Sequence, residues 1–223
     1  MTTPLLPQAF WFRLSVPCRH VSGIPKTGAK GGLLGLDASC SLPKTTMLDD
    51  KPDWADVRVA WNQGGLAIQV ETAKSTEPTA VGSDEDAEGM HGIQVWVDTR
   101  DTRNVSRATR FCHRFSARLL RGKTRSALAV EVSQRPIARA VADAPLCRPE
   151  ILAAHAERLK QGWRIEMFLP AEAFQGFDPE TNRRLGFAYQ VTDHDREDQF
   201  LGVGREFPVG ENPSLWTTLE LRD

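Results

Sequence analysis

The chain has 223 residues, a length that suits one large domain or two small ones, and all-β sandwiches often reach it as a single unit. Its hydrophobic fraction of 40% is enough for a sizeable core, and its net charge of -1 gives no overall attraction to nucleic acid or to an anionic membrane. No apolar run approaches the roughly 18 residues of a membrane-spanning helix, and the first residues lack the basic start and apolar core of a signal peptide. We therefore expect a cytoplasmic protein with no membrane partner and no specific nucleic-acid partner.

The first 49 residues contain one predicted strand and one long connection. Apolar residues alternate from Phe10 to Cys18, which predicts a strand that Pro17 ends. Glycine is dense from Ser22 to Asp37, but this segment lacks the flanking strand, the helix and the Gly-Lys-Ser/Thr ending of a phosphate-binding loop. We expect residues 1–49 to pack as a strand and a glycine-rich loop on a sandwich formed by residues 50–223, the whole being one domain.

From residue 57 onward, apolar and polar residues alternate in short runs that are typical of strands with one buried face. The predicted strands cover residues 57–61, 66–70, 93–97, 127–132, 163–169, 185–191 and 215–221. A single helical turn is predicted at 171–174, and no long helical pattern separates the strands. This spacing predicts an all-β protein with an antiparallel β-sandwich fold. The residues expected in its core are Val57, Val59, Leu66, Ile68, Ile93, Val95, Ile165, Met167, Phe187 and Leu219.

Two segments fit both a helix and a strand. Arginines recur at spacings of three and four between Arg103 and Arg125, which is a helical pattern, while apolar residues from Phe111 to Leu119 alternate as in a strand. The alanine-rich stretch from Ile151 to Leu159 is equally ambiguous. Periodicity alone does not decide between the two structures in either segment.

The cysteines and most of the tryptophans are expected to be structural. Cys18, Cys40, Cys112 and Cys147 are widely spaced and form no CxxC pair, so we expect buried, reduced thiols rather than a zinc site or a disulfide framework. The alternation places Trp54, Trp61 and Trp163 on inward faces, where large aromatic side chains usually belong to the core.

Five motifs, taken in order, resemble family 9 carbohydrate-binding modules and their DOMON-like relatives. They are Trp54-Ala55-Asp56-Val57 with Gly65-Leu66-Ala67-Ile68-Gln69-Val70, Gly92-Ile93-Gln94-Val95-Trp96-Val97-Asp98, Gly162-Trp163-Arg164-Ile165-Glu166-Met167-Phe168-Leu169-Pro170, Leu185-Gly186-Phe187-Ala188-Tyr189-Gln190-Val191-Thr192-Asp193 and Leu215-Trp216-Thr217-Thr218-Leu219. The resemblance covers residues 50–221 and implies a jelly-roll-like antiparallel β-sandwich. It also implies that the 103–125 segment is a loop followed by a strand from about Phe111.

The same resemblance identifies where a sugar would bind. Sugar-binding members hold a pyranose between two tryptophans, with charged and amide side chains around its rim. The matching positions here carry Glu88-Gly89-Met90 and Val209-Gly210-Glu211-Asn212, so neither aromatic is present. An arginine that family members use on the strand after the central one is matched by Arg114. The resemblance therefore implies the fold, whereas the binding of a neutral sugar is in doubt.

The expected ligand-binding residues surround the central strand, and they are Trp96, Asp98, Arg114, His113 and Glu88. Trp96 points away from the face of Ile93 and Val95. It is therefore either an exposed platform for stacking or a side chain packed beneath the segment 73–88.

A basic strip from Arg100 to Arg125 is a second candidate site. Its arginines, of which Arg103, Arg107, Arg110 and Arg118 are the expected contacts, could bind phosphate, sulfate or carboxylate groups through their guanidinium ions. The alternative is a solvated face that neighbouring acidic residues neutralise.

Two further candidates concern a metal and a cofactor. Asp193, Asp195 and Asp198 supply oxygen ligands of the kind that a structural calcium ion prefers, or else they form a charged turn. Met90 and His113 could be the axial ligands through which some DOMON relatives hold haem. No resident cofactor is otherwise expected.

No nucleophile–base pair or carboxylate pair occurs in a recognisable motif, so we expect a protein that is not an enzyme. The function that the resemblance favours is a binding module for a carbohydrate with anionic groups. A module that contacts proteins or anionic polymers through the basic strip is the first alternative, and a haem-binding DOMON-type domain is the second.

Overall fold

A computed structural model describes residues 8–11, 14–26, 32–49, 51, 53–72, 91–121, 128–194 and 196–223. Its strands are β1 (Ser15–His20), β2 (Ala55–Asn62), β3 (Gly65–Thr72), β4 (Gly92–Asp98), β5 (Cys112–Arg121), β6 (Leu128–Arg135), β7 (Ala153–Leu159), β8 (Gly162–Pro170), β9 (Arg184–Thr192), β10 (Gln199–Phe200) and β11 (Thr217–Arg222). Short 3₁₀ helices lie between them: η1 (Gln8–Trp11), η2 (Ala38–Cys40), η3 (Thr45–Asp49), η5 (Pro149–Ile151), η6 (Ala171–Ala173) and η7 (Pro213–Leu215). Within the described residues, no helix is long and apolar enough to cross a membrane.

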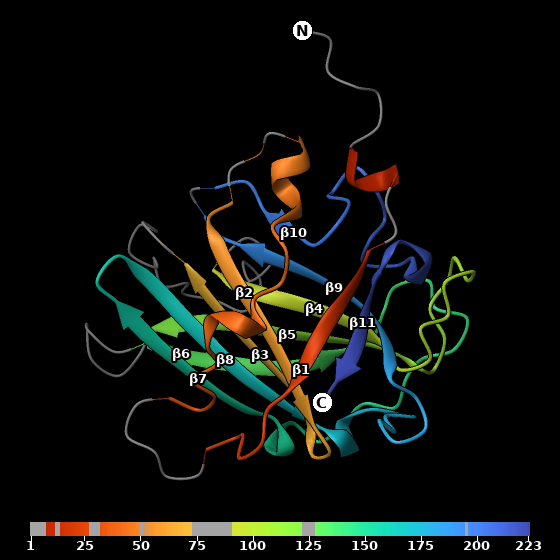
Figure 1. Cartoon of the computed structure of the whole chain (residues 1–223), viewed down its shortest axis with the longest axis horizontal. Coiled ribbons are helices and arrows are strands. Elements are labelled where there is room, and N and C mark those ends of the chain that lie inside the picture. The colour runs from red at the N-terminus through yellow and green to blue at the C-terminus, as the bar shows by residue number, and fades with distance from the viewer. Residues whose placement is uncertain are drawn as a thin grey trace, which may run out of the picture.

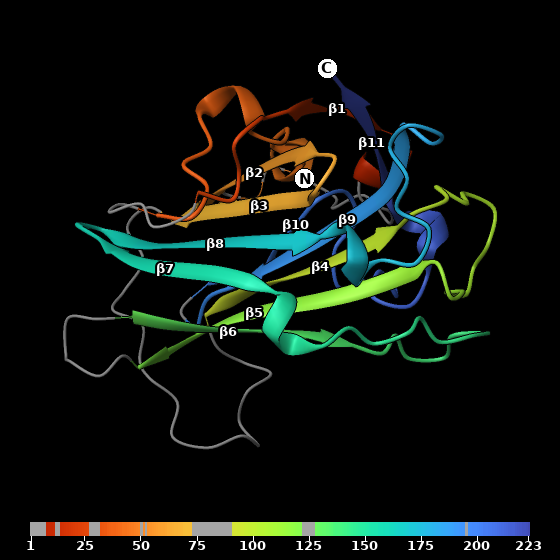
Figure 2. The same ribbon diagram turned by 90° about the horizontal axis from the view of Figure 1, so that it is seen from below.

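The strands form one continuous sheet that folds over on itself (Figures 1 and 2). Its order is β6-β5-β4-β9-β11-β1-β2-β3-β8-β7, with β10 added beside β9. In Figure 2, β9, β4, β5 and β6 make one layer, and β2, β3, β8 and β7 make the other. The end strands β6 and β7 lie against each other, so the layers meet on that side as well. The expected β-sandwich is confirmed, with the refinement that its two layers belong to one sheet.

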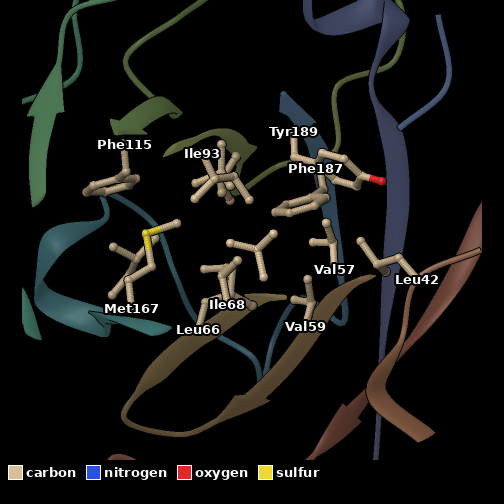
Figure 3. Packing of buried hydrophobic residues seen from close by; sticks show 14 of the residues in the cluster. Leu42, Val57, Val59, Leu66, Ile68, Ile93, Phe115, Met167, Phe187 and Tyr189 are labelled. Atoms are coloured by element: carbon tan, nitrogen blue, oxygen red, sulfur yellow. The ribbon is translucent and has the colours of Figure 1, made fainter. Parts of the chain in front are cut away.

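The core lies between the layers because alternate residues of each strand point inward. Val57 pairs with Val70, and Val59 pairs with Ile68, so neighbouring strands present apolar side chains at the same level. Figure 3 shows Phe115, Ile93 and Phe187 of one layer facing Leu66, Ile68 and Met167 of the other. All ten predicted core residues are buried in this cluster, which confirms the alternation as a guide to the interior.

Strand β1 corrects the prediction for the N-terminal segment. The strand spans Ser15–His20 rather than 10–18, and Pro17 lies within it instead of ending it. β1 runs parallel to both of its neighbours, β11 and β2, whereas the other strand pairs are antiparallel. Its pairing with β2 begins only at Arg19, so Pro17, which has no N–H to donate, lies beside a stretch without that partner.

The two ambiguous segments are both strands. Cys112–Arg121 forms β5, as the family resemblance implied, because pairing with β4 and β6 on its two sides uses its backbone groups. Ala153–Leu159 forms β7, which completes a hairpin with β8. The predicted helical turn is confirmed as η6.

The glycine-rich connection packs on the outer face of the second layer. Ile24, Leu34 and Leu36 are buried there against Phe168 and the small side chains of β2 and β3. The Glu166 carboxylate, itself buried, accepts the backbone N–H groups of Leu33 at 2.6 Å and Gly35 at 2.8 Å. We call residues 32–36 the N-terminal strap.

Candidate functional site

The outer face of the first layer is polar, and strand register defines it. Gln94 pairs with Ser116 on β5 and with Gln190 on β9, and Ser116 pairs with Ser133 on β6, so these four side chains form one row. Residues two positions before or after these along each strand point to the same outer face. The face, which we call the polar face, comprises Gln94, Arg114, Ser116, Arg118, Glu131, Ser133, Arg135, Gln190 and Thr192. The intervening residues Val95, Phe115 and Tyr189 point into the core.

A glutamine–arginine pair lies at the centre of the polar face. Arg114 donates to Gln94 Oε1 from Nε at 2.9 Å and from Nη2 at 2.5 Å. Its guanidinium carbon lies 5.9 Å from the centre of the Trp96 ring. Two hydrogen bonds to one oxygen and an aromatic ring nearby restrict the guanidinium to one orientation. Both side chains remain partly exposed, so a ligand can reach them.

A second hydrogen-bonded group joins the polar face to a pocket. Gln190 Nε2 donates to Asp198 Oδ2 at 2.5 Å, and Arg205 Nε donates to the same oxygen at 2.6 Å. Asp198, Arg205 and Thr192 also line a pocket of about 750 Å³ at the end of β9. We call it the β9-end pocket. Its other lining residues are Lys51, Asp193, His194, Arg196, Glu197, Phe200, Gly204 and Glu206.

Trp96 is covered rather than exposed. Only 3% of the residue is accessible, because Val203, Val209 and Trp216 pack over it. A Cβ placed on Gly210 would lie 3.2 Å from Trp96 Cζ2, so the chain passes directly over the indole. The Trp216 indole N–H donates to the Val209 carbonyl at 2.7 Å and holds this loop down. The prediction of an exposed platform at Trp96 is therefore wrong, and the described residues that cover the indole belong to the segment 203–216. The segment 73–88, the other predicted cover, lies outside the described residues.

Asp98 is buried at the end of β4, where it stabilises a turn. Its carboxylate accepts the backbone N–H groups of Arg100 at 2.9 Å and Thr102 at 2.7 Å. Burial raises the pKa of this carboxyl, while the two backbone hydrogen bonds oppose the rise. Asp98 is thus a structural residue and lies outside the accessible part of the polar face.

His113 lies on the inward face of β5, one position from Arg114. Its imidazole packs between Phe115 and Phe174, and its Nε2 accepts the backbone N–H of Gln175 at 3.1 Å. Burial lowers the pKa of His113 to about 4, so the ring is neutral at pH 7. The structure therefore separates His113 from Arg114, because adjacent strand residues point to opposite faces.

The four arginines of the predicted basic strip each have different partners. Arg103 contacts Asp101 and Thr218 beside β11, and Arg107 donates to the Arg139 carbonyl at 2.8 Å. The Arg110 guanidinium lies 5.0 Å from the Phe111 ring, whereas Arg118 pairs with Glu131 on the polar face. Only Arg118 of the four belongs to the polar face, because β5 begins at Cys112 and the preceding residues form a loop.

The other predicted residues do not gather into one site. Glu88, Met90 and Asp195 lie outside the described residues. Asp193 is buried with its Oδ2 3.3 Å from His91 Nδ1, and Asp198 contacts Gln190 and Arg205. Among the described residues, no group of three or more His, Cys, Asp or Glu side chains could hold a metal ion.

Sequence reasoning missed Gln94, Gln190 and Arg205. The outward phase of the β4 and β9 alternation could have identified both glutamines, because each is polar at a position that faces away from the core. Arg205 had no such signal, because it lies in a loop without periodicity, and its contact with Asp198 depends on how that loop folds.

Comparisons with known proteins were made by sequence and by structure. No protein-family model and no curated protein sequence matches the chain. The structure is similar to that of a family 9 carbohydrate-binding module from Caldicellulosiruptor kristjanssonii in complex with cellotriose, with a TM-score of 0.56, 12% sequence identity and 93% of each chain covered. A structure of a family 9 module from the same organism with glucose gives a TM-score of 0.54 and 12% identity, over 95% of this chain and 96% of that one.

Proposed function

We propose, from the premise that this chain has the fold of family 9 carbohydrate-binding modules, that it is a non-catalytic module that binds a carbohydrate with anionic groups on the polar face. The single observation that carries the proposal is the Gln94–Arg114 pair, which is held in a fixed orientation beside Gln190 and is partly exposed. Fold alone does not determine a ligand, so the argument rests on this group of side chains.

The chemistry of the pair suits an acidic sugar. A guanidinium ion binds a carboxylate or sulfate through charge-assisted hydrogen bonds, and amide side chains donate to and accept from hydroxyl groups. The polar face carries three arginines, Arg114, Arg118 and Arg135, against one acid, Glu131. Its local charge therefore favours an anionic ligand.

The aromatic content of the site favours the same choice. The Val209–Asn212 loop, which matches one of the family's tryptophan positions, has no aromatic residue and packs onto Trp96. The other tryptophan position, Glu88–Met90, has no aromatic residue in the sequence either. A neutral sugar therefore lacks both stacking surfaces that sugar-binding family members use. We expect neutral mono- and disaccharides to bind in the millimolar range or not at all.

The alternatives have less support. A module for proteins or anionic polymers would use a continuous basic strip, and the four arginines of that strip have four different sets of partners. A haem ligand at His113 would have to displace the packing of a residue that is 1% exposed.

The test is calorimetry of the whole chain against glucose, cellobiose, a galacturonate oligomer and heparin. We expect binding to at least one anionic glycan and a loss of about tenfold to a hundredfold in the Arg114→Ala variant, because a hydrogen bond to a charged group is worth about 1.5–3 kcal/mol. Arg222→Ala, which removes an exposed charge at the end of β11, is the matched control and should bind as the wild type does. Micromolar binding to cellobiose with no binding to either anionic glycan would contradict the proposal.

A further inference from the structure

Two exposed aromatic residues lie in the short helix η1. Trp11 is 68% exposed and Phe10 is 41% exposed, although large aromatic side chains are usually mostly buried. The Phe10 ring stacks on the Phe207 ring with centroids 5.0 Å apart and an interplanar angle of 15°. Trp11 meets Phe10 edge to face at 5.9 Å. Phe207 therefore supports Phe10, and Phe10 in turn supports the exposed indole.

We call Phe10, Trp11 and Phe207 the aromatic group. Figure 1 shows η1, drawn in red, on the same side of the molecule as β10, and Phe207 directly follows Glu206, which lines the β9-end pocket. The Phe207 N–H donates to the Gly204 carbonyl at 3.1 Å, and Gly204, Arg205 and Glu206 line the pocket. Helix η1 also packs on η3. Thr45 of η3 accepts the backbone N–H of Gly202 through its hydroxyl oxygen at 3.1 Å. The aromatic group is thus continuous with the pocket wall.

We propose that Phe10 and Trp11 form a stacking platform for an additional sugar unit of the same glycan, beside the β9-end pocket. This inference rests on the proposed function and adds a second subsite to it. The apolar C–H face of a pyranose suits a flat exposed indole, because the ring offers area at little cost in conformational entropy. Phe10 and Trp11 lie far along the chain from both positions at which family 9 modules carry their tryptophans, while their support Phe207 lies just before one of them, Val209–Asn212.

The pocket supplies the polar groups that such a unit needs. Its volume of about 750 Å³ falls within the range of small-molecule sites, roughly 300–1,000 Å³. Lys51, His194 and Glu206 are among its lining residues and can pair with sugar hydroxyls or carboxylates. Arg205 lines the pocket and also contacts Asp198, which contacts Gln190 of the polar face, so the two subsites are joined by one hydrogen-bonded group.

The test uses galacturonate oligomers of one to four units and compares their affinities for the wild type and for variants by calorimetry. We expect the wild-type affinity to rise with length. Trp11→Ala should lower the affinity for the longer oligomers about tenfold and leave the monomer affinity unchanged, because stacking on one aromatic ring is worth on the order of 1–3 kcal/mol per ring in nucleic-acid platforms. Trp11→Phe should retain most of the gain with length. Leu146→Ala, which removes an exposed aliphatic side chain elsewhere, is the matched control.

Fluorescence provides a second measurement. Iodide should quench the exposed Trp11, and a bound tetramer should protect it, whereas Trp11→Phe should show no ligand-dependent protection. If the oligomers bind and Arg114→Ala weakens all of them while Trp11→Ala changes none, the platform is wrong and the proposed function stands. If neither the oligomers nor heparin bind the wild type, the stacking platform and the proposed function are both wrong. Heparin binding that is unaffected by Trp11→Ala also overturns the platform.

Discussion

At the scale of single residues, buried polar groups stabilise the fold at defined points. His113, Asp98 and Glu166 are each about 1% exposed, and each has backbone N–H groups as partners. Burying such groups without hydrogen bonds lowers the stability of the folded state, so the backbone N–H partners are needed for the fold as much as the side chains are. His113 and Asp98, which the sequence suggested as ligand-binding residues, are therefore too deeply buried to contact a ligand.

His113 makes the stability of the protein depend on pH. Its pKa falls from about 6.5 in the unfolded chain to about 4 in the folded one, so between these values the unfolded state binds more protons. The free energy of unfolding should therefore fall as the pH drops from 6.5 towards 4, by about 3 kcal/mol at most from this residue. Urea unfolding of the wild type and of His113→Gln should show a flatter pH profile for the variant.

The control for this experiment is His155→Gln, which replaces an exposed histidine on β7. It should keep the wild-type pH profile. Identical profiles for the wild type and His113→Gln would show that His113 does not contribute to the pH dependence.

At the scale of elements, the N-terminal strap covers a sheet face that would otherwise expose apolar residues. The strap has no regular structure of its own, so its backbone N–H groups need partners from the sheet. Glu166 on β8 accepts two of them, and Gln69 on β3 accepts that of Leu36 at 2.9 Å. Gly32, with a φ of 108°, allows the chain to approach Glu166, since a Cβ there would lie 2.7 Å from its carboxylate oxygen.

Glu166→Gln should destabilise the protein by about 2 kcal/mol, because both carboxylate oxygens accept N–H groups and one amide NH₂ would then face a donor. Glu157→Gln on the neighbouring strand is the matched control. Glu157 Oε2 lies 3.0 Å from Arg164 Nη1, and this ion pair is largely exposed. Exposed ion pairs contribute about 1 kcal/mol or less to the free energy of unfolding. Urea unfolding measures both variants, and equal losses would contradict the role given to Glu166.

At the scale of the whole molecule, β1 and β11 join the two layers. β1 pairs with β11 over five residues and with β2 over two, and it is the strand through which the continuous sheet turns from one layer to the other. Its inward side chains Val16 and Cys18 are buried in the main core. The N-terminal segment is therefore part of the sheet as well as a cover for it.

Two truncated chains test this role. A chain that begins at Leu14 keeps β1 and should unfold cooperatively at nearly the wild-type temperature. A chain that begins at Ser22 lacks β1, leaves β11 and β2 unpaired along one side and empties two core positions, so it should lose cooperative unfolding. Thermal unfolding followed by circular dichroism measures both, and a wild-type transition in the shorter chain would contradict the prediction.

Alternation along the chain predicted the positions of most strands and the ten core residues, because a period of two is a local property that burial of one face imposes. Alternation did not predict the register between distant strands, which pairs Gln94 with Gln190 and brings Arg114 diagonally within hydrogen-bond distance of Gln94. Nor did it show that the 203–216 loop covers Trp96, or that Phe207 supports Phe10. Those contacts join residues far apart in the chain, so only tertiary packing decided which polar face stays open and which aromatic side chains are exposed.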